Sequence, residues 1–493
     1  KQKTAYEIGV RLVGSEMCIR DRVYRLSWHS EAPTLSDDST TQCWLFEGLA
    51  RRAVTVCFDQ ERGSSDGGAV LLGAADRRLG LSEALASCLR DSRDPGRLVH
   101  EVRDLVRQRV FALACGYPDG NDAARLAADP VHKLLVGRAP LGDDDLASQP
   151  TLSRFENAAD RSDLFRMGTA LAERVIERHR RRRRGRARMV TIDLDQTDDP
   201  AHGQQQLALF NGYYGQWCYL PLLGFVSFDD EADQYLVAAV LRPGNAPDKR
   251  GALGVLARLL PRLRAAFPKA RFRVRLDAGF AAPELLDFLD AQGDVLYAVA
   301  MGKNPILLRR SEKYMAQARR LSNANDATEH VYAETLYATK TWPRRRRIII
   351  KAEVTRHPGR APKDNPRFVI TNMTQTPRWV YEDFYCRRGE IENRIKELHH
   401  GLEIDRTSCS RFLANQLRVL LTAAAYVLMQ ELRLRAAGTK LARAQVSTLR
   451  DCLLKIGARV NSSVRRIVLH LPESFPFGHA WATVAQGLGA SPG

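Results

Sequence analysis

Two aspartates stand where predicted β-strands end. In residues 189–197 (MVTIDLDQT) apolar residues alternate with polar ones, and Asp195 closes the strand. In residues 271–280 (RFRVRLDAGF) the same alternation ends at Asp277, just before an Ala–Gly turn. A carboxylate in so apolar a strand must be paired, hydrogen-bonded or bound to a metal ion. Asp195 and Asp277 are therefore candidate metal ligands or catalytic groups.

A third carboxylate is expected from a helix over residues 384–400 (FYCRRGEIENRIKELHH), which contains three glutamates. At about 100° per residue, one buried stripe forms from Phe384, Ile391, Ile395 and Leu398. Glu392 lies beside this stripe, in a row with Tyr385, Arg388 and His399. Glu390 and Glu397 lie on the opposite side and are predicted to face solvent. Glu392 is therefore the candidate catalytic glutamate.

The three carboxylates together suggest a site for a hard cation. Either aspartate taken alone is more often a strand-end residue that caps its own backbone. Two such residues in one small α/β unit, with a third carboxylate arriving from a helix, reverse that balance. Mg²⁺ takes oxygen ligands, commonly one or two carboxylates together with substrate phosphates. The neighbouring Asp198, Asp199 and His202 are expected to be structural rather than metal ligands.

Several elements must position these residues. Between residues 188 and 300 we predict three strands, a helix, a strand, a helix and a further strand, with the first strands antiparallel and the later ones parallel. Helical periodicity dominates residues 50–178 after a short β opening, and strands recur in RRIIIKAEV and RFVITNM. The resulting division is a non-native leader (1–22), a mainly helical DNA-binding region (50–178), a basic linker (179–188), the first part of an α/β core (189–300), a β-rich insertion (301–380), and the core helix with C-terminal helices (381–470).

The charge of the chain indicates a polyanionic partner. Lys and Arg number 75 against 57 Asp and Glu, a formal net charge of +18, in a chain that is 44% hydrophobic. Nucleic acid is the commonest such partner, although an Arg-rich surface alone would also give this excess. The basic stretch at 171–188 is interpreted as a hinge that grips phosphates. Arg103, Arg107 and Arg109 lie off the apolar stripe of a predicted helix and are expected to be solvated or to contact DNA.

Other function classes have little support in the sequence. The nine cysteines form no CxxC pair, so neither a zinc ribbon nor a disulfide framework is indicated, and a reducing cytoplasm fits. The longest apolar run, Val419 to Met429, is too short to span a bilayer. No glycine-rich nucleotide-binding motif is present.

The spacing Tyr385-x2-Arg388-x3-Glu392 resembles the Tyr–Arg–Glu–Lys helix signature of bacterial insertion-sequence transposases of the DDE class. Three longer blocks, at 193–214, 275–280 and 385–397, are similar to one group of these enzymes, and weaker similarity covers most of residues 64–470. The resemblance has one departure. The lysine of the signature falls seven residues after the glutamate, where this chain has His399, while Lys396 lies on nearly the same face one turn earlier.

The resemblance implies an RNase H-like catalytic core in which Asp195, Asp277 and Glu392 hold two Mg²⁺ or Mn²⁺ ions. It further implies phosphodiester hydrolysis and strand transfer at the ends of an insertion sequence. The partners would be terminal inverted repeats, target DNA and a second copy of the chain in a synaptic complex, near the bacterial nucleoid. Tyr385, Arg388 and Lys396 would contact phosphates. Trp342 could stack on an unpaired base, or could simply be a core residue.

Two rival functions remain open on the sequence. One is a catalytically silent, sequence-specific DNA-binding protein derived from a transposase, although all three acidic positions are intact. The other is a nuclease that hydrolyses DNA without strand transfer.

Overall fold

The computed structural model describes residues 43–46, 52–247 and 249–491, which belong to two compact units, 1–61 and 62–493. The expected leader at 1–22 lies outside the described residues. In the first unit, β1 (Cys43–Phe46) pairs antiparallel with β2 (Val54–Cys57), the predicted β opening. Cys43 and Cys57 are directly opposite in this register and form a disulfide. This bond differs from the expectation of no disulfides, because the two cysteines are 14 residues apart and no spacing motif links them.

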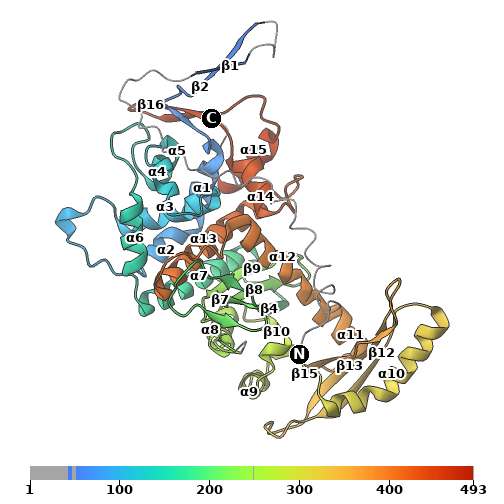
Figure 1. Ribbon diagram of the computed structural model, residues 1–493. Helices are drawn as coiled ribbons and strands as arrows, with labels where there is room; N and C mark the ends of the chain where they lie inside the picture. Colours follow the sequence, from blue (N-terminus) through green and yellow to red (C-terminus); the bar gives the residue numbers. More distant parts are fainter. Residues whose placement is uncertain (1–42, 47–51, 248, 492–493) are drawn as a thin grey trace, which may run out of the picture. The chain divides into compact units, whose positions relative to one another are not determined.

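The larger unit is built on a mixed β-sheet, which confirms the predicted α/β class (Figure 1). Five core strands lie in the order β9-β8-β4-β10-β11. Their bounds are β4 Met189–Gln196, β8 Leu222–Phe228, β9 Tyr235–Val240, β10 Arg271–Leu276 and β11 Val295–Met301. β4, β8 and β9 are antiparallel neighbours, whereas β10 and β11 run parallel to β4. This is the predicted antiparallel-then-parallel arrangement of an RNase H-like core.

The segment read as a β-rich insertion continues the same sheet beyond β11. β15 (Arg367–Thr371) pairs with β11, β13 (Arg346–Thr355) with β15, β12 (Glu329–Tyr337) with β13, and the short β14 (Lys363–Asp364) also joins β13. The long helix α10 (Pro305–Asn325) covers β12 and β13 and was not predicted. Its buried stripe includes Ser311, Ala318 and Ser322, so its hydrophobic period is weak. Its start is signalled by the Asn304 cap and Pro305.

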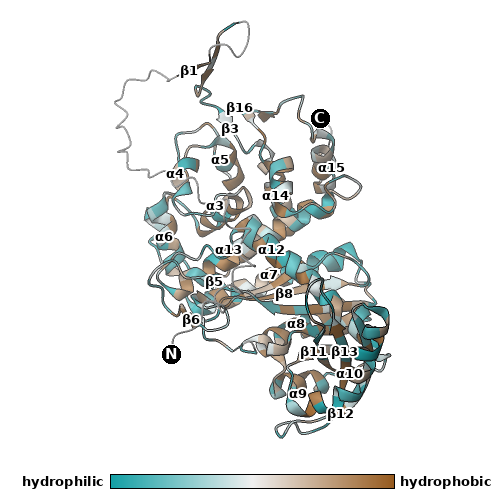
Figure 2. Ribbon diagram, turned by 45° about the vertical axis from the view of Figure 1, so that its right-hand side comes forward, coloured by the Kyte–Doolittle hydropathy of each residue, from teal (hydrophilic) through white to brown (hydrophobic). Residues whose placement is uncertain are grey.

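Helices cover the core sheet and connect its strands. α8 (Ala252–Ala266) and α9 (Pro283–Ala291) make the crossovers into the parallel strands, while α7 (Arg161–Arg182) and α13 (Phe412–Arg435) pack against β9. Among the residues that the structure describes, α13 alone has the length and apolar composition of a membrane span, and most of it is buried inside the protein. The hydropathy colouring shows its apolar residues among the surrounding helices (Figure 2).

The N-terminal region of this unit is helical, as predicted. Its helices are α1 (Val70–Leu79), α2 (Leu81–Ala86), α3 (Val102–Ala114), α4 (Asp122–Leu126), α5 (Pro130–Val136) and α6 (Gln149–Ala158). α1, α3 and α6 contact α13. α7 extends to Arg182, so most of the basic stretch read as a hinge is the end of a helix that begins with an Asp160–Asp163 capping box.

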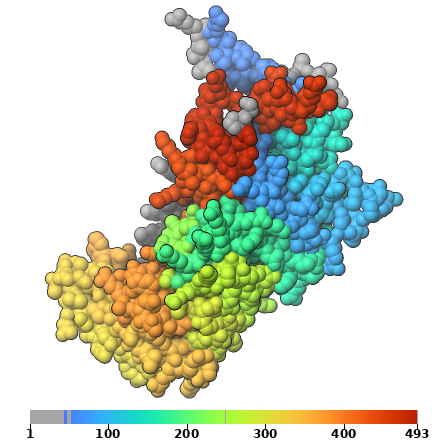
Figure 3. All heavy atoms as spheres, turned by 180° about the vertical axis from the view of Figure 1, so that it is seen from behind, coloured from blue at the N-terminus to red at the C-terminus, as the bar shows by residue number. Residues whose placement is uncertain are grey.

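The C-terminal elements pack back onto the N-terminal helices, as Figure 3 shows from behind. β16 (Ala458–Ser462) pairs with both β17 (Ile467–His470) and β3 (Gly63–Ser64), and α15 (Gly478–Leu488) contacts α1. α14 (Val446–Leu449) precedes them and continues as a π-helical turn through Leu454. The small sheet β5 (Asp199–Pro200), β6 (Leu209–Asn211) and β7 (Gln216–Tyr219) follows β4 directly.

Candidate active site

The register of two parallel strands brings the two aspartates together. β10 pairs with β4 so that Arg275 lies opposite Asp193. Asp277 and Asp195 each follow two residues further along, and they lie close enough for their charges to interact. Neighbouring strands are about 4.8 Å apart. Asp195 is buried at the end of β4, whereas Asp277 follows β10 and is exposed. The carboxyl edge of the sheet therefore carries two adjacent carboxylates, one shielded and one open to solvent.

Glu392 reaches this edge from a helical segment with an irregular backbone. A short helix, α11 (Pro377–Trp379), leads into a π-helical turn (Val380–Tyr385), a 3₁₀ turn, α12 (Glu390–Lys396) and a second π-helical turn (Glu397–Gly401). Such π-helical insertions in a helix occur frequently at functional sites. Three residues of the predicted stripe, Phe384, Ile391 and Leu398, are buried, and Glu392 is exposed beside them.

The structure corrects the expectation for Glu397, which is buried rather than solvated. Its carboxylate accepts hydrogen bonds from the Tyr426 hydroxyl at 2.7 Å, from Arg433 at 2.8 Å and from Arg394 at 3.0 Å. Helical spacing predicts one buried face for this segment, but α13 covers a second side of it. Glu390, in contrast, is exposed as expected and accepts a hydrogen bond from Gln234 at 2.9 Å.

Burial and neighbouring charges both act on the Asp195 carboxylate. Burial, together with the weaker effect of the negative charges of Asp277 and Glu392, raises the pKa of Asp195 to about 6, although Arg388 opposes the shift. Arg388 Nη2 lies 2.8 Å from Asp195 Oδ2. The Arg388 guanidinium thus contacts Asp195 and also lies close enough to Asp277 for their charges to interact. The ligand atoms that the three carboxylates offer are all oxygens, which fits a hard divalent ion. The carboxylates do not form a set whose ligand atoms all lie within 4.8 Å of one another.

The other predicted phosphate contacts differ in their surroundings. Arg388 is mostly buried, and its Nε atom has no hydrogen-bond partner in the structure. Tyr385 is half-buried against Tyr381, with ring centroids 5.7 Å apart, and Lys396 is exposed on α12. Trp342 is only 8% exposed: it packs edge-on against Tyr337, and the Arg346 guanidinium lies over its ring. The structure therefore places Trp342 in the core, the second of the two interpretations given above.

His399, which stands at the position of the signature lysine, connects two loops. Its Nε2 lies 2.8 Å from Thr197 Oγ1, and its Nδ1 lies 3.3 Å from Asp405. Thr197 follows Asp195 by two residues, so the imidazole connects the end of β4 to the segment after the helix that carries Glu392. The segment after the helix that carries Glu392 also contacts Asp199. Thr407 in this segment donates a hydrogen bond at 2.9 Å to the buried Asp199 carboxylate. Asp199 is thus structural, as the sequence suggested.

Sequence reasoning missed the partner of Asp193. Arg275 Nε and Nη2 each lie 2.7 Å from a carboxylate oxygen of Asp193, and Nη1 donates to the Phe384 carbonyl at 3.1 Å. This buried pair ties β4, β10 and the start of the glutamate-bearing segment together. The alternation of RFRVRL contained the signal, because Arg275 faces the same side of its strand as Asp277.

A second cluster of metal-ligating residue types lies away from the carboxylates. Asp66, Cys115 and His132 are buried, with ligand atoms within 4.8 Å of one another. Lys455 Nζ, however, lies 2.8 Å from Asp66 Oδ1, and His132 Nε2 lies 2.9 Å from Asp66 Oδ2. Because both carboxylate oxygens already contact nitrogen donors, we interpret the cluster as an ion-pair network that joins the N-terminal helices to the C-terminal segment.

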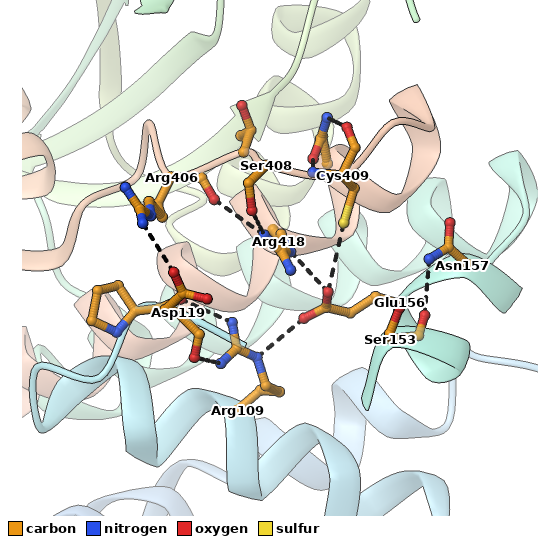
Figure 4. A network of polar contacts seen from close by, with 12 residues as sticks. Arg109, Asp119, Ser153, Glu156, Asn157, Arg406, Ser408, Cys409 and Arg418 are labelled. Atoms are coloured by element: carbon orange, nitrogen blue, oxygen red, sulfur yellow. Dashed lines mark hydrogen bonds and ion pairs between the residues drawn. The ribbon is translucent and has the colours of Figure 1, made fainter. Parts of the chain in front are cut away.

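Arg109, expected at the surface, is instead fully buried in a polar network between α3, α6 and α13 (Figure 4). Glu156 lies between Arg109 Nε at 3.1 Å and Arg418 Nε at 2.8 Å. Asp119 pairs with Arg406 at 2.9 Å. Arg103 and Arg107 also lie near carboxylates, those of Glu83 and Asp76 among them. The surface position expected for Arg109 is therefore wrong, whereas Arg103 and Arg107 are partly exposed, and their contact with DNA stays a prediction.

Comparisons with known proteins show the family of this chain. The family model described as "Transposase DDE domain group 1" matches residues 46–492. No curated protein gives a significant match. Among solved structures, one similar chain is from a complex described as "Cryo-EM structure of piggyBac transposase synaptic complex with hairpin DNA (SNHP)". That chain is 9% identical, with a TM-score of 0.41, over 83% of this chain and 81% of the other.

Proposed function

The chain belongs to the transposase DDE domain group 1 family and is a DNA transposase, and from this premise we propose that it hydrolyses and transfers the ends of a bacterial insertion sequence. The proposal rests on one observation above all. Asp195 and Asp277 are neighbours at the carboxyl edge of the sheet, and Glu392 acts electrostatically on Asp195 from the helical segment.

Asp195, Asp277 and Glu392 are the residues that would hold divalent metal, Mg²⁺ or Mn²⁺. Two such ions, when bound, supply charge stabilisation for the attacking and leaving oxygens of an in-line displacement at phosphorus. The raised pKa of Asp195 supports this assignment. Burial and nearby negative charges disfavour the ionised form of this carboxylate, and a bound cation would stabilise that form.

Protein side chains would orient the DNA for this displacement. Arg388 has a buried Nε without a hydrogen-bond partner, and its Nη2 lies 2.8 Å from Asp195 Oδ2, so a phosphate there would meet a guanidinium held in place. Tyr385 and Lys396 would steady neighbouring phosphates from the same helical segment. Water attacks first and releases a 3′-hydroxyl at the element end. That hydroxyl then attacks target DNA in the same site.

The proposed partners follow from the reaction and the charge. Terminal inverted repeats and target DNA are polyanions, and a net charge of +18 favours binding to their phosphates. Joining two element ends to one target requires at least two active sites, so we propose a homodimer or larger synaptic complex in the bacterial cytoplasm.

A plasmid assay tests the proposal with a matched control. The full chain is incubated with Mg²⁺ and a plasmid that carries the genomic DNA flanking this reading frame on both sides. We expect nicking at the ends of inverted repeats, lowered by about a hundredfold or more in Glu392→Gln, since metal stabilisation is worth several kcal/mol. Glu390→Gln, two residues away and also exposed, should nick as the unaltered protein does.

Two outcomes would favour the rival functions. Specific binding without nicking, by the unaltered chain and Glu392→Gln alike, would indicate a silent DNA-binding protein. Cut ends that never join a target plasmid would indicate a nuclease without strand transfer.

A further inference from the structure

Three exposed aromatic side chains lie on a hairpin that begins directly after the catalytic strand. We call residues 201–219 the aromatic hairpin; it contains β6 and β7. Phe210 is 55% exposed, Trp217 60% and Tyr213, at the tip, 89%. Phe210 and Trp217 are cross-strand partners with ring centroids 6.2 Å apart. Nothing in the described part of the chain covers these three rings, although large aromatic side chains are usually buried.

The base and the turn of the aromatic hairpin are held firmly. At the base, the Tyr219 hydroxyl donates to the Gln206 carbonyl at 2.8 Å, and Gln206 N donates to the Ser410 carbonyl at 2.9 Å. At the turn, the Asn211 side chain accepts from the backbone N–H groups of Tyr213 and Tyr214 at 3.0 and 3.2 Å. The exposed rings therefore project from an ordered support, which lowers the entropy lost when a ligand binds them.

Close approach of a neighbouring loop fixes the orientation of the aromatic hairpin. The Asn211 side chain donates to the Gly244 carbonyl at 2.9 Å. A Cβ atom at Gly244 would lie 2.1 Å from the Cys218 carbonyl oxygen and 2.3 Å from that of Leu209. Only glycine fits there, so the loop clamps β6 and β7 from one side.

The aromatic hairpin is within reach of DNA held at the carboxylates. β5, which pairs with β7, begins four residues after Asp195, and Gln216 donates to Asp198 at 2.7 Å. At about 3.3 Å per strand residue the tip lies roughly 10–20 Å beyond the base of the hairpin. Base steps along one DNA strand are about 3.4 Å. The rings would then meet bases roughly three to six steps from the scissile phosphate.

The chemistry of the surface favours bases over other partners. Residues 201–219 contain no Asp, Glu, Lys or Arg, in a chain whose net charge is +18. Phosphates would contact the basic residues elsewhere, while uncharged aromatic rings suit the faces of bases, on which stacking is tolerant of sequence. The buried Trp342 cannot supply this contact as it stands, whereas Phe210, Tyr213 and Trp217 can.

We propose that the aromatic hairpin stacks on unpaired DNA bases beside the cleavage site, an inference that rests on the proposed function for its placement on the substrate. Stacking there would stabilise bases that leave the duplex when the end of the element is cut, and would hold the scissile strand against Asp195.

A fluorescence titration without metal tests the contact separately from cleavage. The full chain, in EDTA, is titrated with a single-stranded oligonucleotide that carries one 2-aminopurine, whose emission reports stacking. We expect the unaltered chain to change the emission. The triple variant Phe210→Ala/Tyr213→Ala/Trp217→Ala should bind roughly 5- to 150-fold more weakly for each stacked base that is lost. Phe165→Ala, which removes an aromatic residue that is 56% exposed on α7, is the matched control and should bind normally.

Tyr213→Ser covers the case in which the triple variant does not fold. The Tyr213 side chain is 89% exposed at the tip, where its ring meets that of Tyr214 edge-on, so its loss should leave the fold intact. Equal affinity and emission for Tyr213→Ser and the unaltered chain would overturn the proposal. So would a folded triple variant that binds DNA normally but changes from dimer to monomer in light scattering, because the hairpin would then be a protein interface.

Cleavage of matched and mismatched duplexes separates this inference from the proposed function. With Mg²⁺, we expect the variants to nick a fully paired end at least about tenfold more slowly and to recover when mismatches flank the cleavage site. Normal nicking of the paired end by the variants would refute the inference and leave the transposase function intact. A hairpin-dependent emission change without nicking by any protein would refute the cleavage function alone.

Discussion

Replacing Arg275 by methionine is expected to destabilise the larger unit by about 3–5 kcal/mol, because it leaves the Asp193 carboxylate buried without a cation. Arg275 makes two 2.7 Å contacts with Asp193 and a further one to the Phe384 carbonyl. The two charged side chains are 5% and 0% exposed, so water cannot replace the guanidinium. The loss would be a large fraction of a typical unfolding free energy of about 5–15 kcal/mol.

A second variant separates the charge effect from loss of packing. In Asp193→Leu/Arg275→Met both charges are absent, and replacing a whole buried ion pair with apolar residues is often neutral or stabilising. We expect its unfolding free energy to return to within about 1–2 kcal/mol of the unaltered protein. Its nicking should stay slow, because the Phe384 carbonyl, at the start of the segment that carries Glu392, has lost its donor.

Urea unfolding followed by tryptophan fluorescence measures both variants, and the plasmid assay measures nicking. A loss below about 1 kcal/mol for Arg275→Met would show that the carboxylate is not isolated from water. A double variant as unstable as the single one would show that packing, and not the unpaired charge, causes the loss. Either result would refute the reasoning about this pair.

Three further predictions concern other residues of the same unit. Glu397→Gln should lower the unfolding free energy by about 2–4 kcal/mol, since it disrupts a buried ion-pair network, whereas Glu390→Gln should stay within about 0.5 kcal/mol in the same urea assay. Burial, with nearby arginines, lowers the pKa of His179 well below 6.5, so below pH 6.5 this histidine takes up a proton in the unfolded chain but not in the folded one. The free energy of unfolding should therefore fall by up to about 1.4 kcal/mol per pH unit below pH 6.5. His179→Phe should flatten that slope in urea titrations at several pH values. His399→Ala should slow nicking about tenfold, because the imidazole contacts Thr197, two residues after Asp195, and a small misplacement of a reacting group is costly. DNA affinity should be unchanged in anisotropy measurements; a changed affinity with an unchanged rate would contradict this positioning role.

Local patterns in the sequence were enough to identify the candidate site. Alternation located the strand ends at Asp195 and Asp277, and helical spacing chose Glu392 over its neighbours. Both patterns report how a residue sits on its own strand or helix, and that geometry is set by the backbone over a few residues. The α/β order followed from the same information, because strands and helices alternate along the chain in the order in which they pack.

Local patterns did not predict which residues far apart in the chain form ion pairs. Arg109 and Glu397 look like surface charges until α13 covers them, and their partners include side chains far away, as in the pair of Glu156 and Arg418, which are 262 residues apart. Helix α10 escaped notice because its inner stripe contains Ser and Ala, whose burial is decided by the strands beneath them.

By itself, the sequence determined which residues are acidic at strand ends, which helix face carries Glu392, and how strongly basic the chain is. Tertiary structure alone decided that Asp277 stands beside Asp195, that Trp342 is covered, and that Phe210, Tyr213 and Trp217 are not. The physical reason is that periodicity follows from backbone geometry within one element. Burial and charge pairing, in contrast, depend on which other element occupies the space opposite, and that is settled only when the whole chain has folded.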